Sequence, residues 1–205
     1  MKPDYWQKAI RELSRKDPVL GQLIRQYRGA ALVSRGAPFV TLVRSIIGQQ
    51  ISVKAADSVW RRIVGKVPDL APSTILACSI EQLRQCGLSA RKAEYITDLA
   101  THFNNGQIHI ERWPLMDDAE IIAELTAVRG IGVWTAEMFL IFNLLRPDVF
   151  PLDDIGLQKA VAQQYFSGER PDRKALADTG ERWRPWRSVA TWHLWRSLDP
   201  VAVEY

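Results

Sequence analysis

The sequence predicts an all-α protein, and three observations carry this prediction. Apolar residues recur at spacings of three and four along most of the 205 residues, which is the period of a helix with one buried face. No segment shows the alternation of a half-buried strand. Capping residues, prolines and glycines separate the periodic runs by short loops, without a low-complexity linker or an internal repeat.

Four helices are expected in the first third of the chain, over residues 4–13, 18–27, 38–50 and 53–64. Pro18 and Pro38 begin two of them, because the first turn of a helix does not need the N–H that proline lacks. Ser52 can cap the fourth helix with its hydroxyl. The third run has its apolar residues on one face, which predicts that it packs against a core.

Two short helices around Ile75 and Leu83 come next, followed by longer ones over residues 91–103, 119–128, 134–145, 154–165, 172–181 and 185–198. Ser89 can cap the first of the longer helices, and Asp117 or Asp118 opens the second. The run over residues 134–145 is apolar on nearly every side, which predicts a buried helix.

The composition is that of a globular chain, with an ordinary apolar fraction and a formal charge of +4. This basic excess permits an anionic partner without requiring one. Cys78 and Cys86 are the only cysteines, so a zinc site or an iron–sulfur cluster held by four thiolates is excluded. The charged N-terminus lacks the apolar core of a signal peptide, and no run is long enough to span a bilayer. We therefore expect a cytoplasmic protein without a targeting signal, whose cysteines are reduced core residues.

A two-glycine turn, Gly130-Ile131-Gly132, joins two predicted helices into a helix–hairpin–helix. Glycine has no Cβ, so it can adopt positive φ and lets a phosphate approach the backbone closely. The N–H groups at the start of the following helix have no intrahelical partner, and the helix dipole favours an anion there. We expect contacts to nucleic-acid phosphates from Gly130, Gly132, Val133 and Thr135. The alternative interpretation is a tight corner between helices that binds nothing.

A carboxylate pair, Asp153-Asp154, follows a proline-bounded loop and precedes the helix over residues 154–165. An acid at this position can cap the helix start. A carboxylate that faces a cleft could instead stabilise positive charge or activate water. The pattern by itself leaves both interpretations open.

Three separated segments resemble the helix–hairpin–helix–GPD superfamily of base-excision DNA glycosylases, in particular its 3-methyladenine DNA glycosylase II (alkylated-base) branch. They read VRGIGVWTAEMFLIF, DVFPLDDIGLQKAV and ERWRPWRSVATWHLW, and the similarity spans roughly residues 39–195. The resemblance implies an all-α single unit over residues 1–205, in which two helical lobes surround a DNA-binding cleft. One lobe, which carries the hairpin, would span about 38–148, and the other 1–37 plus 149–205.

The resemblance also implies a reaction, the hydrolysis of the N-glycosidic bond of alkylated purines (3-methyladenine and 7-methylguanine) during base-excision repair. Asp154 matches the family's catalytic carboxylate, which would stabilise the positive charge that base loss leaves on the deoxyribose. Asp153 falls one position early and is expected to cap the helix or support the site. Trp134 stands where glycosylases that also cut the backbone carry a lysine, so a monofunctional enzyme is implied.

Trp134 and Trp195 match positions of the family's base pocket. Aromatic faces there replace the stacking that a flipped base loses, and a cationic alkylated purine adds a cation–π contact. Trp195 could also be an ordinary core residue, because it recurs at helical spacing with Trp192. Met138 and Ile155 stand where the bacterial enzyme of the resembled branch has tyrosines, so we expect a pocket with fewer aromatic residues than in that enzyme.

Gln50, with its neighbour Gln49, matches the residue that wedges into the duplex and fills the gap left by the flipped base. The hairpin carbonyls that match a structural Na⁺ or K⁺ site in the family are those of Thr126, Val128 and Ile131. No other cofactor is expected. The expected partner is double-stranded DNA with a flipped damaged base, bound by a monomer and without a membrane.

Scattered basic residues could contact phosphates or form a solvated face: Arg91, Lys92, Lys159, Arg182, Arg184 and Arg187. The three histidines show no metal-ligand spacing, and His193 is expected to be structural. Two alternatives to the alkylated-base enzyme stay open, a glycosylase for deaminated or oxidised bases and a non-catalytic helix–hairpin–helix DNA-binding module. A generic all-α interaction protein is a more distant third.

Overall fold

The computed structural model describes residues 2–199, and within them it contains twelve α-helices and no strand. The all-α prediction is therefore confirmed. The helices are α1 (Trp6–Lys16), α2 (Pro18–Gln26), α3 (Pro38–Gly48), α4 (Val53–Lys66), α5 (Pro72–Leu76), α6 (Ile80–Arg84), α7 (Ala90–Asn104), α8 (Asp118–Thr126), α9 (Val133–Phe142), α10 (Ile155–Tyr165), α11 (Arg173–Glu181) and α12 (Arg187–Leu198). Several begin with a serine or aspartate whose side chain accepts a backbone N–H of the first turn, as predicted for Ser52 and Ser89.

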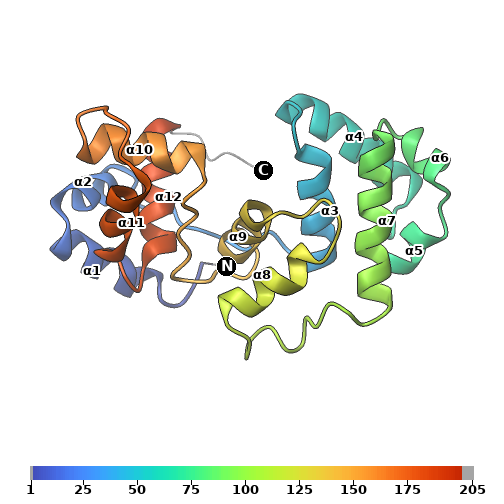
Figure 1. The fold of residues 1–205 in the computed structure, drawn as a ribbon, viewed down its shortest axis with the longest axis horizontal. Coiled ribbons are helices and arrows are strands. Elements are labelled where there is room, and N and C mark those ends of the chain that lie inside the picture. The colour runs from blue at the N-terminus through green and yellow to red at the C-terminus, as the bar shows by residue number, and fades with distance from the viewer. Residues whose placement is uncertain (1, 200–205) are drawn as a thin grey trace. The chain divides into compact units, whose positions relative to one another are not determined.

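Contacts between Cα atoms group the described residues into two compact units, whose helices are labelled in Figure 1. Unit 1 consists of residues 2–34 and 140–199 and contains α1, α2, α10, α11 and α12. Unit 2 consists of residues 35–139 and contains α3 to α8. Helix α9 begins in the residues of unit 2 and ends in those of unit 1.

The core of unit 1 is built from α1, α2, α10 and α12. Trp6 of α1 meets Trp192 of α12 edge to face, with 5.3 Å between the ring centroids. A buried carboxylate joins the elements, since Asp17 Oδ1 caps α2. Its Oδ2 accepts the Tyr165 hydroxyl and the Trp183 indole N–H, each at 3.0 Å. Most of the C-terminal tryptophans thus serve the core of this unit.

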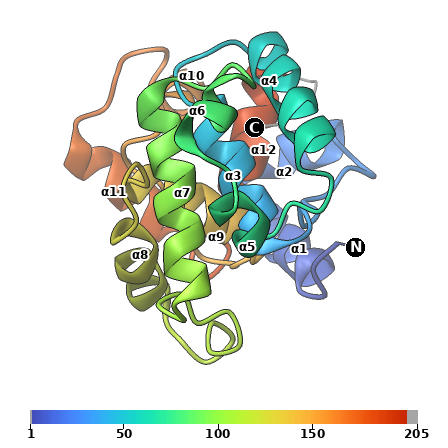
Figure 2. The ribbon, with the colours of Figure 1, turned by 90° about the vertical axis from the view of Figure 1, so that its right-hand side faces the viewer.

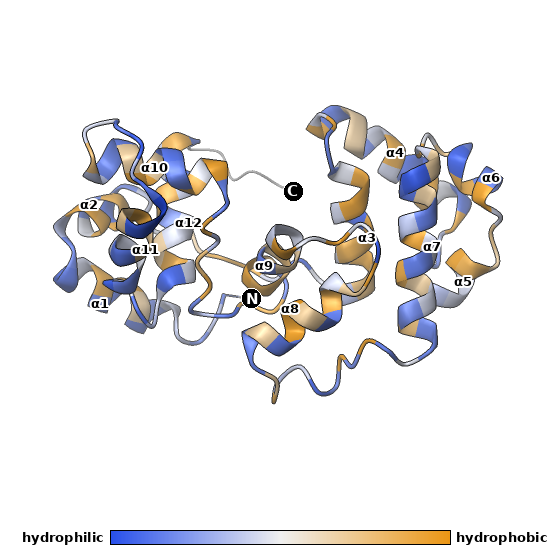
Figure 3. Ribbon diagram, viewed as in Figure 1, coloured by the Kyte–Doolittle hydropathy of each residue, from blue (hydrophilic) through white to orange (hydrophobic). Residues whose placement is uncertain are grey.

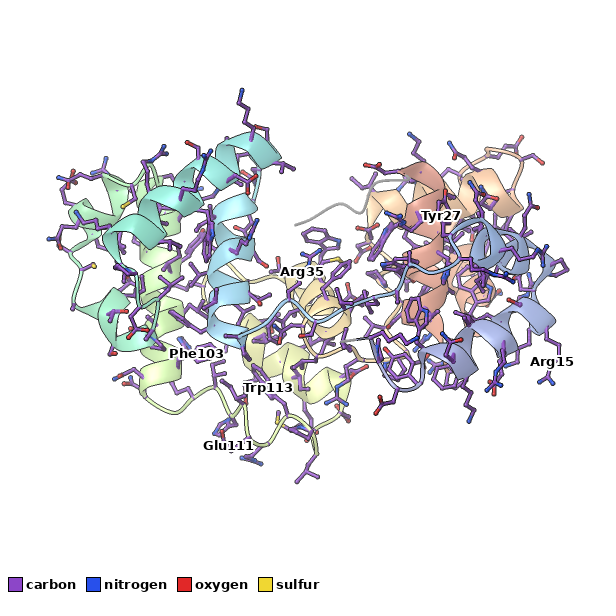
Figure 4. The ribbon with its side chains drawn as sticks, turned by 180° about the vertical axis from the view of Figure 1, so that it is seen from behind. Arg15, Tyr27, Arg35, Phe103, Glu111 and Trp113 are labelled. Atoms are coloured by element: carbon purple, nitrogen blue, oxygen red, sulfur yellow. The ribbon has the colours of Figure 1, made fainter. Side chains whose placement is uncertain are left out.

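The core of unit 2 lies around α3 and α7, which pack side by side (Figure 2). The apolar face predicted for α3 is buried, and Figure 3 shows hydrophobic residues along this helix. Phe39 of α3 meets Phe103 of α7, labelled in Figure 4, at 5.2 Å between ring centroids. Helix α5 packs on α7 as well. Burial of one face of α3 therefore explains why its apolar residues recur at spacings of three and four.

The long loop before α8 is anchored by Trp113, also labelled in Figure 4. Its ring packs edge-on against Phe139, with 5.4 Å between centroids. Its indole N–H donates to Glu124 Oε1 at 2.7 Å, and the same oxygen accepts the backbone N–H of His109 at 3.0 Å. This carboxylate fixes the loop on α8.

Helices α3 and α9 are among those that end earlier than predicted, and in both cases a residue with left-handed backbone follows. Helix α3 ends at Gly48, before Gln50 with φ of 57°. Helix α9 ends at Phe142, before Leu145 with φ of 55°. Neither of these left-handed residues is a glycine, which is the usual residue in such a conformation at a helix end. Contacts from distant residues lie at both ends: Lys92 donates to Gln49 O after α3, and the Tyr5 hydroxyl donates to Leu145 O after α9.

Cys86 is buried, Cys78 is half-buried, and both are free thiols. No helix within residues 2–199 is long and apolar enough to cross a membrane.

Candidate functional site

Asp154 is the N-cap residue of α10 and lies in the interior of unit 1, with 8% of its surface exposed. Its Oδ1 accepts the backbone N–H of Leu157 at 2.6 Å and the indole N–H of Trp195 at 2.8 Å. The first bond is the helix cap that the sequence allowed. The second is not needed for capping. It connects the carboxylate to a tryptophan 41 positions away in the chain.

Trp195 is held on two sides. Besides its bond to Asp154, its ring stacks on Phe142, with 5.6 Å between centroids and 15° between planes. Gly156 lies against this pair, since a Cβ there would be 3.2 Å from Asp154 Oδ1, a tight contact, and 3.4 Å from Trp195 Nε1, an ordinary van der Waals contact. The Asp154–Trp195 cluster, which we define as these two residues with Phe142 and Gly156, is thus a packed arrangement of a carboxylate and two aromatic rings. In such a cluster the negatively charged carboxylate keeps a fixed orientation.

Asp153 does not cap α10, so that part of its predicted role is wrong. Asp154 takes the cap, whereas Asp153 is 68% exposed and forms an ion pair with Arg173 of α11. Asp154 alone of the pair is buried because its bonds to Leu157 and Trp195 satisfy it there.

The two-glycine turn lies in unit 2, and Gly130 is required there. Its φ is +87°, and a Cβ at this position would lie 2.2 Å from the Tyr95 ring. The neighbouring Arg129 fixes the turn on α7, because its backbone N–H donates to Asp98 Oδ2 at 2.9 Å and its Nε to Oδ1 at 3.2 Å. The packing of the Tyr95 ring thus requires a glycine at this position, and the contact of Gly130 with a phosphate stays a prediction.

The start of α9 presents its backbone on the open side of the same turn. A Cβ on Gly132 would have nothing within 4 Å, and Val133 and Trp134 are exposed. The N–H groups of the first helical turn have no intrahelical acceptor, so this surface suits a phosphate. Thr135 has its side chain in the interior, which leaves only its backbone for such a contact.

The predicted wedge segment adjoins this turn within unit 2. The Gln49 amide Nε2 donates to Gly130 O at 2.9 Å. Gln50 is exposed and follows directly. Lys92 was expected to contact phosphates or solvent. Its ammonium group instead donates hydrogen bonds to Ile47 O at 2.7 Å and to Gln49 O at 2.6 Å. Sequence reasoning missed this contact, because no periodicity relates residue 92 to the end of α3.

The four predicted base-pocket residues have different surroundings. In unit 2, Trp134 is 38% exposed and Met138 is buried. In unit 1, Ile155 is 80% exposed, whereas Trp195 belongs to the Asp154–Trp195 cluster. Phe142 was not predicted as a site residue, since a helix that is apolar on every side does not mark one of its residues.

Several basic residues expected to contact phosphates or solvent are engaged in ion pairs of unit 1. Arg184 and Arg187 bind Asp148 and Glu181. Arg182 lies 3.7 Å from Asp17. These ion pairs stabilise the segment before α12.

His193 is structural, as predicted. It is 2% exposed, its Nδ1 lies 2.8 Å from Val189 O, and its ring stacks on Trp6. Burial lowers the pKa of His193 to about 4, so the ring is neutral at pH 7. His193 is not part of the Asp154–Trp195 cluster.

The residues that the resemblance assigns to a monovalent cation have carbonyl oxygens with acceptor capacity. The Ile131 N–H donates to Val128 O at 3.1 Å, so two of the expected ligand residues lie in one tight turn. A carbonyl oxygen has two lone pairs, and Val128 O therefore keeps acceptor capacity for a cation. Thr126 is the last residue of α8, where carbonyls lack an intrahelical partner.

Residues 43–185 match the family described as HhH-GPD superfamily base excision DNA repair protein. The chain belongs to this family. The identification drawn from the three segments is thus confirmed. Among relatives of this HhH-GPD protein, DNA-3-methyladenine glycosylase 1 of Schizosaccharomyces pombe is 32% identical over 184 residues, which cover 87% of this chain and 80% of that protein. A Bacillus subtilis protein named DNA-3-methyladenine glycosylase is 28% identical over 199 residues, 91% of this chain but only 66% of its own length.

Solved structures agree with this membership. The crystal structure of a DNA-3-methyladenine glycosidase from Bacillus halodurans matches with a TM-score of 0.86 and 36% identity, covering 93% of this chain and 89% of that one. The Schizosaccharomyces pombe 3-methyladenine DNA glycosylase Mag1, in complex with abasic DNA, matches with a TM-score of 0.79 and 30% identity. That match covers 96% of this chain and all (100%) of the other.

Proposed function

We propose that this HhH-GPD protein is a monofunctional DNA glycosylase that removes alkylated purines, 3-methyladenine and 7-methylguanine, from double-stranded DNA. The observation that carries the proposal is the Asp154–Trp195 cluster, which places a buried carboxylate and an aromatic ring in contact. The names of the relatives support the lesion class, and the abasic-DNA complex of a related protein supports the product.

Asp154 is the residue to which we assign the catalysis. In the reaction, the bond between C1′ and the base nitrogen breaks, and its electron pair leaves with the base. The sugar becomes positively charged, and the Asp154 carboxylate, which is only 8% exposed, stabilises this charge more strongly than a fully hydrated carboxylate would. A water oxygen then bonds to C1′ and releases a proton, which leaves an abasic site. A cationic purine is already a good leaving group, so this mechanism needs no strong general acid.

Base recognition is assigned to the tryptophans. An alkylated purine is electron-poor and cationic, and its stacking on an indole is partly a cation–π contact. Trp195 is preorganised for this role by Phe142 and by its bond to Asp154. Trp134 has no amine that could form a Schiff base with the sugar, so the enzyme would leave the DNA backbone intact.

DNA binding is assigned to the surface around the two-glycine turn. The amides at the start of α9 would contact a phosphate, and Gln50 would fill the gap left by the flipped base. A Na⁺ or K⁺ held by the carbonyls of Thr126, Val128 and Ile131 would supply a positive charge next to that phosphate.

The test is base release from duplex DNA that contains 3-methyladenine, followed by alkali to reveal abasic sites. We expect release by the wild-type protein, and loss of release by more than about a hundredfold for Asp154→Asn. Asp153→Asn is the matched control, because the adjacent carboxylate is exposed and outside the cluster. Strand breaks should appear only after alkali. Release of other bases, in a panel with deaminated and oxidised lesions, would replace the assigned substrate, and DNA binding without release of any base would identify a binding module.

A further inference from the structure

A lysine from another helix of unit 2 holds the end of α3. Lys92, the third residue of α7, donates its ammonium to Ile47 O at 2.7 Å and to Gln49 O at 2.6 Å. The carbonyls in the last turn of a helix have no intrahelical partner and carry the negative end of the macrodipole, so an ammonium stabilises them. The backbone of Lys92 is fixed as well, because its N–H donates to Ser89 Oγ at 3.2 Å.

The residue that follows this contact has an unfavourable backbone conformation. Gln50 has φ of 57°, a left-handed conformation that costs free energy for any residue with a Cβ. Such a conformation persists only where the surroundings hold it. On one side, the Gln49 carbonyl is bound by Lys92 and the Gln49 side chain by Gly130 O. On the other side, Ser52 caps α4.

We propose that Lys92 is a positioning residue, which binds the carbonyl before Gln50 and thereby fixes the left-handed backbone from which Gln50 is presented to DNA. This inference rests on the proposed function, in which Gln50 fills the gap in the duplex. Lys92 touches neither the lesion nor the reacting atoms and acts only through the wedge. Its loss therefore impairs excision from a duplex, where a gap must be filled, and leaves excision from a single strand unchanged.

The experiment compares release of 3-methyladenine from duplex and single-stranded DNA by the wild type and by Lys92→Met, which removes the ammonium and keeps an unbranched side chain. We expect duplex excision to fall on the order of tenfold, because two charged hydrogen bonds are lost. Single-strand excision should not change. Lys66→Met, which removes an exposed lysine of the same unit, is the matched control and should leave both rates as in the wild type.

The ratio of duplex to single-strand excision is the decisive quantity. A variant that is partly unfolded loses both activities in proportion, so the ratio does not depend on the folded fraction. Lys92→Arg keeps the charge and the donors and should restore the ratio at least in part.

A double-mutant cycle with Gln50→Ala tests the connection directly. If Lys92 acts through Gln50, Lys92→Met adds little once Gln50 is truncated, and the double variant has the duplex rate of Gln50→Ala alone. Additive losses, or an equal loss on both substrates, would overturn the inference. An unchanged ratio in Lys92→Met would overturn it too. By contrast, a wild-type protein that releases no base from either substrate contradicts the proposed function itself.

Discussion

Gly130→Ala should destabilise unit 2 strongly, whereas Gly132→Ala, two positions away in the same turn, should not. Gly130 has φ of +87°, and a Cβ would lie 2.2 Å from a carbon of the Tyr95 ring. The left-handed backbone costs an alanine about 1–2 kcal/mol, and forcing an atom into a packed site costs about 1–3 kcal/mol. The free energy of unfolding should therefore fall by about 2–5 kcal/mol.

Gly132 is the matched control for this prediction. A Cβ there meets nothing within 4 Å and the backbone is not in the left-handed region, so the loss should stay below about 1 kcal/mol, the scale of a changed helix start.

Urea unfolding followed by Trp fluorescence measures both values. Tyr95→Ala in the Gly130→Ala background should recover part of the loss, because the clash disappears while the backbone strain remains. Equal stabilities of the two glycine variants would refute the argument, because they would show that the turn accommodates a Cβ at residue 130 without a costly clash with the Tyr95 ring.

Two further predictions concern unit 1. Trp195→Phe keeps an aromatic ring on Phe142 but removes the indole N–H bound to Asp154. Its base excision should fall on the order of tenfold with a melting temperature close to that of the wild type, and an unchanged rate would exclude Trp195 from orienting the carboxylate. The second is a pH effect of His193, whose pKa is lowered by burial to about 4. The unfolded chain, with an ordinary pKa of about 6.5, binds the proton first as the pH falls, so stability decreases between pH 6.5 and 4. From pH 7 to pH 5 this group should lower the free energy of unfolding by about 2 kcal/mol. His193→Gln should lack that component in urea titrations at the two pH values, and an equal loss in both proteins would contradict the assignment.

Much of the local structure follows from short-range signals. Ser52 and Ser89 begin helices where the sequence predicted them, and Asp117 is one of the two residues predicted to begin α8, because a side-chain cap depends on residues only three positions away. The ends of α3 and α9 were predicted too late, because the left-handed Gln50 and Leu145 are not glycines and because distant residues bind the carbonyls of Gln49 and Leu145.

The candidate site likewise has features that the sequence predicted and features that only tertiary contacts decided. The sequence alone predicted the all-α class and the two-glycine turn, because these depend on periodicity and spacing. Through segments that resemble those of a known family, it also indicated the family and the choice of Asp154 as the proposed catalytic acid. Only the tertiary structure decided which acid of the pair is buried, that Trp195 donates to Asp154 and stacks on Phe142, and that Lys92 binds the end of α3. These contacts join residues far apart in the chain. Their formation depends on how helices pack, and no local pattern of residues encodes that packing.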